Sequence, residues 1–254
     1  MGRKTNNGKQ STFREMLKEI KTAENASKPQ SLPEYYIITE GQTEKWYLIH
    51  LKNAGKLKFT FPEPKSVDGG DYLSKIKKEI DKISAMPRKK IICIFDVDKF
   101  NNSQTLFGEY LKFMAQYNQS GINIYNNMPS IEYWFLLHYF KKTITKFYTK
   151  NELLNELTKH SPFKNKSEQA LKSEAFLSSV NWFNELCGKD FKNLTTAIKN
   201  AKNNHSITSH KRMDKVSSPT DCDVSYSDMY KLFEINNNSS DKKNSSDKKN
   251  RNVL

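Results

Sequence analysis

The stretch Ile91-Ile92-Cys93-Ile94-Phe95-Asp96-Val97-Asp98 decides the fold class of this 254-residue chain. Its uninterrupted apolar run, residues 91–95, predicts a strand buried on both faces, as in a parallel sheet covered by helices. Asp96 and Asp98 follow two positions apart, so on a strand they point to the same face. Strand ends of α/β domains open onto the crevice where ligands bind. The stretch therefore predicts both a parallel sheet and an acidic site at its edge.

A second apolar strand, residues 35–39, also ends in acid. Glu40 follows it directly, Gly41 allows a sharp turn into a helix, and Glu44 lies in or next to the first turn of that helix. Carboxylates that converge on one crevice repel each other unless a cation neutralises them, and Mg²⁺ or Mn²⁺ prefer oxygen ligands. Two simpler interpretations stay open: Glu44 as an exposed acid favoured by the helix dipole, and the aspartate pair as a turn or cap.

The order of strand and helix signals predicts an α/β fold, a mostly parallel sheet flanked by helices with a C-terminal helical extension. We expect strands at residues 35–39, 57–61, 91–95 and 121–125, and helices at residues 43–53, 71–83, 103–117, 131–140, 152–159, 167–186 and 191–202.

Four segments are expected along the chain. Residues 1–32 are polar and basic and predict a flexible arm. Residues 33–145 form the α/β core, and residues 146–235 form a helical extension that completes the domain. Residues 236–254 contain the repeat SSDKKN-SSDKKN, a composition typical of a disordered tail.

Composition favours a polyanionic partner. The chain has 42 Lys and Arg against 28 Asp and Glu, a formal net charge of +14. Nucleic acid is the first candidate, although a lysine-rich composition alone also produces such a charge. The three cysteines form no disulfide framework or zinc pair. No apolar run is long enough for a membrane span, so we expect a cytoplasmic protein without a membrane partner.

Three segments of the chain carry a resemblance to a known family: Ile38-Thr39-Glu40-Gly41-Gln42-Thr43-Glu44-Lys45-Trp46-Tyr47-Leu48, Phe95-Asp96-Val97-Asp98 and Asn127-Met128-Pro129-Ser130-Ile131-Glu132-Tyr133-Trp134-Phe135-Leu136-Leu137-His138. The order of a strand with Glu-Gly followed by a strand with Asp-x-Asp resembles the TOPRIM domain of topoisomerases, primases and OLD-family nucleases. With the third segment, around Glu132, the chain resembles more particularly the RloB-like family.

The resemblance implies a metal-dependent nuclease in phage defence or a restriction-associated system, often beside an ATPase of the ABC or AAA type. It implies that Glu40 and Glu44 bind or orient metal, that Asp96 and Asp98 bind metal, and that Glu132 completes the cluster. The catalytic set is then Glu40, Asp96, Asp98 and Glu132, with two Mg²⁺ or Mn²⁺ ions hydrolysing a phosphodiester.

Other functions stay open at this stage. The runner-up is a catalytically weak TOPRIM-like subunit that binds nucleic acid and regulates a partner ATPase; a third is a structural RNA-binding protein. No base-reading motif is present, and the lysines of residues 75–90 are either phosphate contacts or a solvated helix face.

His138 follows Glu132 by six positions, about 120° round a helix, so both side chains cannot point squarely into one site. A structural hydrogen bond is the first expectation for His138. Substrate contact or support of the metal ligands is the alternative.

Overall fold

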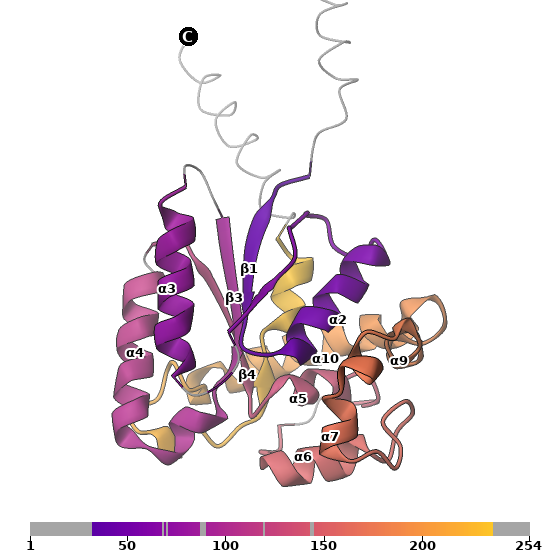
Figure 1. Cartoon of the computed structure of the whole chain (residues 1–254). Helices are drawn as coiled ribbons and strands as arrows, with labels where there is room; N and C mark the ends of the chain where they lie inside the picture. The colour runs from indigo at the N-terminus through magenta and orange to yellow at the C-terminus, as the bar shows by residue number, and fades with distance from the viewer. Residues whose placement is uncertain are drawn as a thin grey trace, which may run out of the picture. The chain divides into compact units, whose positions relative to one another are not determined.

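A computed structural model describes residues 32–67, 69, 71–86, 90–118, 120–142 and 145–235 (Figure 1). The chain divides into two units, residues 1–33 and residues 34–254, and the description that follows concerns the second. The expected basic arm lies outside the described residues, except for Leu32. The tail at residues 236–254 also lies outside them.

The described part of the chain forms a five-stranded sheet with the order β2-β1-β3-β4-β5. The first four strands are mutually parallel, and the last pairs antiparallel with β4. This arrangement confirms the predicted α/β fold with a mostly parallel sheet. The strands are β1 (Tyr35–Thr39), β2 (Lys65–Ser66), β3 (Lys90–Asp96), β4 (Asn123–Met128) and β5 (Tyr226–Ser227).

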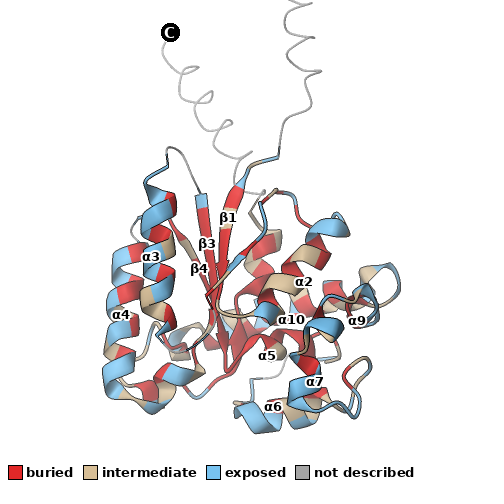
Figure 2. Ribbon diagram, viewed as in Figure 1, coloured by how far each residue is buried: buried red, intermediate tan, exposed pale blue. Residues whose placement is uncertain are grey.

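Helices cover both faces of the sheet (Figure 1), which buries the strands (Figure 2). On β3, Ile91, Cys93 and Phe95 pack into one core cluster, and Ile92 and Ile94 pack into another. This alternation is what a strand buried on both faces requires. The first cluster is shared with α3 (Tyr72–Ser84) and α4 (Gln104–Asn118), and the second with α2 (Gln42–Asn53), α5 (Ile131–Leu136) and α10 (Lys192–Thr208).

The predicted strand at residues 57–61 is wrong. Leu57, Phe59 and Phe61 are buried as the alternation suggests, but the segment makes only one isolated bridge, between Glu34 and Thr60. Prolines at positions 62 and 64 have no N–H to donate to a ladder, and the edge strand β2 forms after them.

The predicted helix at residues 167–186 is three short helices, because serines interrupt it. Ser167, Ser173 and Ser179 each accept a hydrogen bond from a backbone N–H of the helix that follows, as N-cap residues do. The short helices are α7 (Glu168–Leu171), α8 (Glu174–Leu177) and α9 (Val180–Cys187), and α6 (Lys150–Leu157) precedes them.

The helical extension shares its core with the α/β part. Trp182 and Phe183 of α9 contact the ring of Tyr47 on α2, and Trp182 also contacts Phe135 on α5. Short 3₁₀ helices connect the remaining elements: η1 (Asp98–Asn102), η2 (Lys189–Phe191), η3 (Ser209–Lys211), η4 (Pro219–Asp221) and η5 (Met229–Phe233). None of the helices that the structure describes combines the length and apolar character needed to span a bilayer.

A buried ion pair attaches the C-terminal strand β5 to the sheet. The Arg212 guanidinium lies 2.5 Å from Asp228 Oδ2, and both side chains are almost fully buried. The same oxygen accepts a hydrogen bond from the backbone N–H of Asn126 on β4. Burial opposes ionisation of Asp228, but Arg212 and Lys231 together lower its pKa. Asp228 therefore joins Arg212 and the segment that follows β5 to β4.

Candidate carboxylate site

A cavity of about 380 Å³ lies where β1 and β3 end, and all five predicted carboxylates line it. The structure thus brings together three sequence segments, one after β1, one after β3 and one after β4. The lining acids are Glu40, Glu44, Asp96, Asp98 and Glu132.

Glu40 holds the two strand ends in register. Its own N–H donates to the carbonyl oxygen of Ile94, and its Oε2 accepts a hydrogen bond of 3.1 Å from the N–H of Asp96. Its other oxygen, Oε1, lies 2.7 Å from the Lys99 ammonium. The carboxylate is therefore placed by backbone geometry and balanced by one lysine.

Asp96 is the acid in this cavity with an unpartnered buried oxygen. Its Oδ1 is buried and has no hydrogen-bond partner, while its backbone carbonyl accepts a hydrogen bond from the Tyr72 hydroxyl at 2.8 Å. Burial, followed by the charges of Glu44, Glu40 and Glu132, raises the pKa of Asp96 well above its usual range.

Glu44 is buried, with 3% of its surface exposed, so the interpretation as an exposed acid at a helix N-terminus is wrong. Burial raises the pKa of Glu44 to about 8, and the charges of Glu40 and Glu132 add to the effect. Without a cation the Glu44 side chain is therefore largely protonated at neutral pH.

Asp98 and Glu132 complete the set. Asp98 begins η1, and burial raises its pKa, opposed by the positive charges of Lys150 and Lys99. Glu132 lies in the first turn of α5 and accepts a hydrogen bond of 2.5 Å from the Ser130 hydroxyl. Ser130 is the N-cap residue of α5, but its side chain makes no capping bond and holds Glu132 instead.

Three lysines that no sequence motif predicts line the same cavity: Lys99, Lys150 and Lys172. Lys172 lies 2.6 Å from Glu168, and Lys150 lies 3.8 Å from the same carboxylate. Lys150 and Lys172 come from the helical extension, where no motif or spacing marks them.

The carboxylate oxygens that line the cavity are the kind of ligand that a hard divalent cation prefers. The lining acids offer only oxygen, one buried oxygen of Asp96 has no partner, and their mutual repulsion favours a cation between them. Among the residues that the structure describes, however, no three acidic, histidine or cysteine side chains lie close enough together to form a metal cluster.

His138 does not line the carboxylate cavity. It is buried, and its Nδ1–H donates to the carbonyl oxygen of Trp134 at 3.0 Å, the structural hydrogen bond that was the first expectation. The ring instead lines a separate cavity beside α10.

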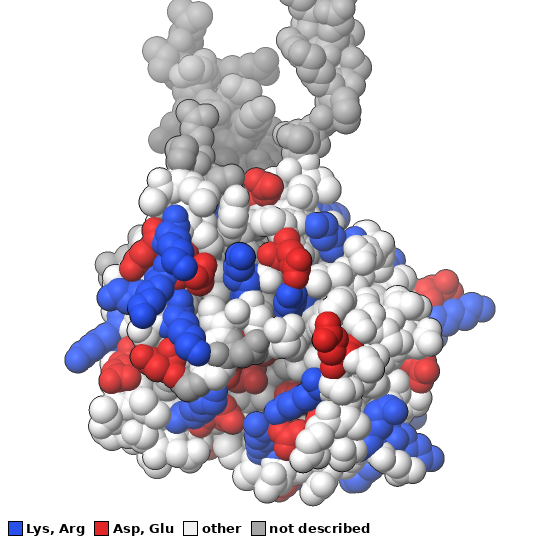
Figure 3. All heavy atoms as spheres, viewed as in Figure 1, with Lys and Arg blue, Asp and Glu red and all other residues white. Residues whose placement is uncertain are grey.

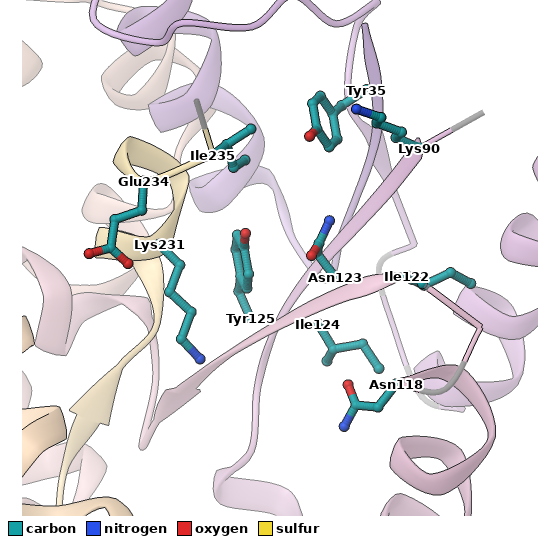
Figure 4. A pocket seen from close by; sticks show the side chains of 11 residues that line it. Tyr35, Lys90, Asn118, Ile122, Asn123, Ile124, Tyr125, Lys231, Glu234 and Ile235 are labelled. Carbon is teal, nitrogen blue, oxygen red and sulfur yellow. The ribbon is translucent and has the colours of Figure 1, made fainter. Parts of the chain in front are cut away.

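A larger cavity, about 770 Å³, lies at the opposite ends of the strands (Figure 4). Tyr35 begins β1, Lys90 begins β3 and Asn123 begins β4, and all three line it. Among its lining residues Glu234 is the single carboxylate, so this cavity lacks the acidic chemistry of the site at the other edge.

Comparison with known proteins gives one match. A family model described as RloB-like protein matches residues 35–235, well over half of the chain. No curated protein and no solved structure matches this sequence. The matched region contains all five carboxylates of the cavity and the buried pair Arg212–Asp228. The chain belongs to the RloB-like family.

Proposed function

We propose that this protein is a Mg²⁺- or Mn²⁺-dependent nuclease that hydrolyses phosphodiesters at the carboxylate cavity, in phage defence or a restriction-associated system. The observation that carries the proposal is the convergence of five carboxylates, from three separate segments, on one cavity at the ends of two parallel strands. Such a convergence is costly without a cation, since burial and repulsion both oppose the ionised forms.

The residues that would hold the cation are Glu40, Glu44, Asp96, Asp98 and Glu132. When bound, divalent ions supply the positive charge that polarises a phosphodiester and lowers the pKa of water. Asp96 offers its unpartnered Oδ1, and Ser130 keeps the Glu132 carboxylate in place through its hydroxyl. These contacts are present before any ligand binds.

The lysines of the cavity suit an anionic substrate. Lys150 and Lys172 bring positive charge to the rim from the helical extension. A phosphodiester that enters the cavity is attracted by these ammonium groups, whereas the carboxylates alone repel it. The mixture of acids and lysines therefore fits a polynucleotide better than a neutral substrate.

The test is cleavage of a panel of DNA and tRNA substrates with Mg²⁺, with Mn²⁺ and with EDTA. We expect metal-dependent cleavage by the wild type and none by Asp96→Asn. The matched control is Asp221→Asn, the same change at an exposed position of η4 outside the cavity. Cleavage by Asp96→Asn at the wild-type rate contradicts the proposal.

A second candidate is a catalytically weak subunit that binds nucleic acid and regulates a partner ATPase. Two observations favour it: Lys99 is paired with Glu40, and the described carboxylates form no compact metal cluster as they stand. This candidate predicts nucleic-acid binding without cleavage under every metal condition, together with a change in ATP hydrolysis when the partner is added.

A further inference from the structure

A third cavity, about 810 Å³, lies between the chain that follows α5 and one side of α10. Residues 138–142 form one wall. The other wall comes from α10 residues at positions 192, 193, 196, 199, 200 and 203, a spacing that places them along one side of the helix. The cavity therefore follows α10 for much of its length.

The lining is strongly basic. Lys141, Lys142, Lys192 and Lys199 line the cavity and no carboxylate does. Within the described part of the chain, none of these four lysines forms an ion pair with an acidic side chain. Four like charges around one cavity repel each other, so an anion in the cavity lowers the electrostatic energy.

The lysines of α3 provide a contrast. A groove on that helix also contains lysines, but Glu79 lines it and lies 2.5 Å from Lys82. In Figure 3 the basic side chains over α3 lie among acidic ones. The charge on α3 is thus partly balanced, whereas the charge beside α10 is not.

The walls of the α10 cavity are held together by a buried amide. Asn200 is 4% exposed, and its Nδ2 donates to the carbonyl oxygens of Leu137 at 3.0 Å and Phe140 at 2.9 Å. One side chain therefore ties the segment after α5 to the middle of α10. The cavity is a built feature of the fold, because its two walls are bonded to each other across it.

His138 adds an unsatisfied polar atom to the cavity wall. The ring is 2% exposed, and its Nε2 is buried without a hydrogen-bond partner. Because Nδ1–H donates to Trp134, a neutral ring leaves Nε2 as an acceptor. A buried polar atom without a partner is unfavourable, so a small movement that gives Nε2 a hydrogen-bond donor would stabilise this wall.

We propose that the α10 cavity is a phosphate-binding site, separate from the carboxylate cavity, that takes a phosphate group of a polynucleotide or of a free nucleotide. Lys141, Lys142, Lys192 and Lys199 provide the positive charge. The site lies past the C-terminal end of α5, while Glu132 lies in the first turn of that helix. The two cavities therefore border opposite ends of α5, a helix of six residues and roughly 9 Å in length, which a short polynucleotide can follow.

The site is tested by binding, with cleavage prevented. The probes are fluorescein-labelled single strands of one sequence, as RNA and as DNA, and separately AMP and inorganic phosphate, whose binding is measured directly by isothermal titration calorimetry. The protein is the full chain carrying Asp96→Asn, in EDTA. The test variant adds Lys141→Gln, Lys192→Gln and Lys199→Gln. The control adds Lys77→Gln, Lys78→Gln and Lys112→Gln, the same charge change at exposed positions of α3 and α4.

We expect the test variant to bind the labelled strands at least about tenfold more weakly than the control. We also expect its log K to fall less steeply with log salt concentration, the slope changing by about 0.7 per lost phosphate contact. This result supports the site with a polynucleotide as its ligand. Loss of AMP or phosphate binding with unchanged strand binding supports the site with a free nucleotide as its ligand.

Two results overturn the proposal. If the test and control variants lose affinity equally, the lysines act only through overall charge. If neither variant loses affinity for any probe, the cavity binds no phosphate. Because the measurement excludes metal and cleavage, its outcome is independent of whether the carboxylate cavity is a nuclease site.

Discussion

The backbone N–H of Asp96 donates a hydrogen bond to the carboxylate of Glu40, which joins the ends of two neighbouring strands. Glu40 is thus part of the sheet's own hydrogen-bonding pattern as well as of the cavity. Moving Glu40 toward a ligand would also move the end of β3, where Asp96 lies. This bond couples the positions of the two carboxylates.

The first prediction concerns cation-dependent stability. Wild-type protein should melt at a higher temperature in Mn²⁺ than in EDTA, because a ligand that binds only the folded state stabilises it by mass action. Asp96→Asn should lose most of this gain. In EDTA at pH 7.5 the variant should be at least as stable as the wild type, since burial and four neighbouring acids oppose ionisation of Asp96. Thermal melting monitored by circular dichroism measures both effects.

A Mn²⁺ gain that persists in Asp96→Asn would place the cation elsewhere. Asp221→Asn, at an exposed position, should keep the full gain and serves as the control.

The second prediction concerns Lys99. Its ammonium lies 2.7 Å from Glu40 and about half of its side chain is exposed. Lys99→Gln should raise the affinity for Mn²⁺ by about 2–5-fold, because an exposed pair of this kind is worth about 0.5–1 kcal/mol and the lysine competes with the cation for Glu40. Isothermal titration calorimetry with Mn²⁺ measures the change.

Lys45→Gln is the matched control, since Lys45 also pairs with a glutamate, Glu63, and neither residue lines the cavity. Unchanged or weaker Mn²⁺ binding in Lys99→Gln would show that Lys99 does not compete with the cation.

The core of the fold could be predicted from local pattern, and so could the acids of the site. The run at residues 91–95 has no polar interruption, so burial on both faces was the simplest reading, and β3 has it. Residues 57–61 alternate in the same way as a strand does, yet they form a buried loop. The alternation predicts which side chains are buried. It does not predict whether the segment pairs with a neighbouring strand, and here the prolines that follow cannot donate to a ladder.

The lysines of the site could not be predicted. Lys150 begins α6, and Lys172 lies at the end of α7, one of the short helices that serine caps separate within residues 167–186. Nor could Arg212 and Asp228 be predicted, since their pairing depends on the path of the chain after α10. Contacts of this kind follow from tertiary packing, which leaves no periodic trace in the sequence.

The third prediction concerns the buried pair itself. Asp228→Ala should lower the free energy of unfolding by about 3–5 kcal/mol, because it leaves the buried Arg212 without its partner. Chemical denaturation measures this value. Asp223→Ala, which breaks the exposed pair with Lys211, should cost less than about 1 kcal/mol. Equal costs for the two changes would mean that Asp228 is not a structural anchor.

The last prediction concerns acid stability and rests on His138. Burial lowers the pKa of His138 from 6.5 to about 4, opposed in part by its hydrogen bonds to Trp134 and Phe135. Between these two pH values the unfolded chain binds a proton that the folded protein does not, so stability falls as the pH drops through this window. The stabilisation that comes from this group is fully present above pH 6.5. The contribution of this one group is roughly 3 kcal/mol.

His138→Gln keeps a hydrogen-bond donor but does not titrate, so its unfolding free energy should change less between pH 7 and pH 4.5 than that of the wild type. His210→Gln, at an exposed position, should follow the wild-type curve. Urea denaturation at a series of pH values measures the difference. Parallel curves for wild type and His138→Gln would mean that the His138 ring takes up a proton in the folded protein as readily as in the unfolded chain, and the buried, neutral acceptor beside α10 would then not exist.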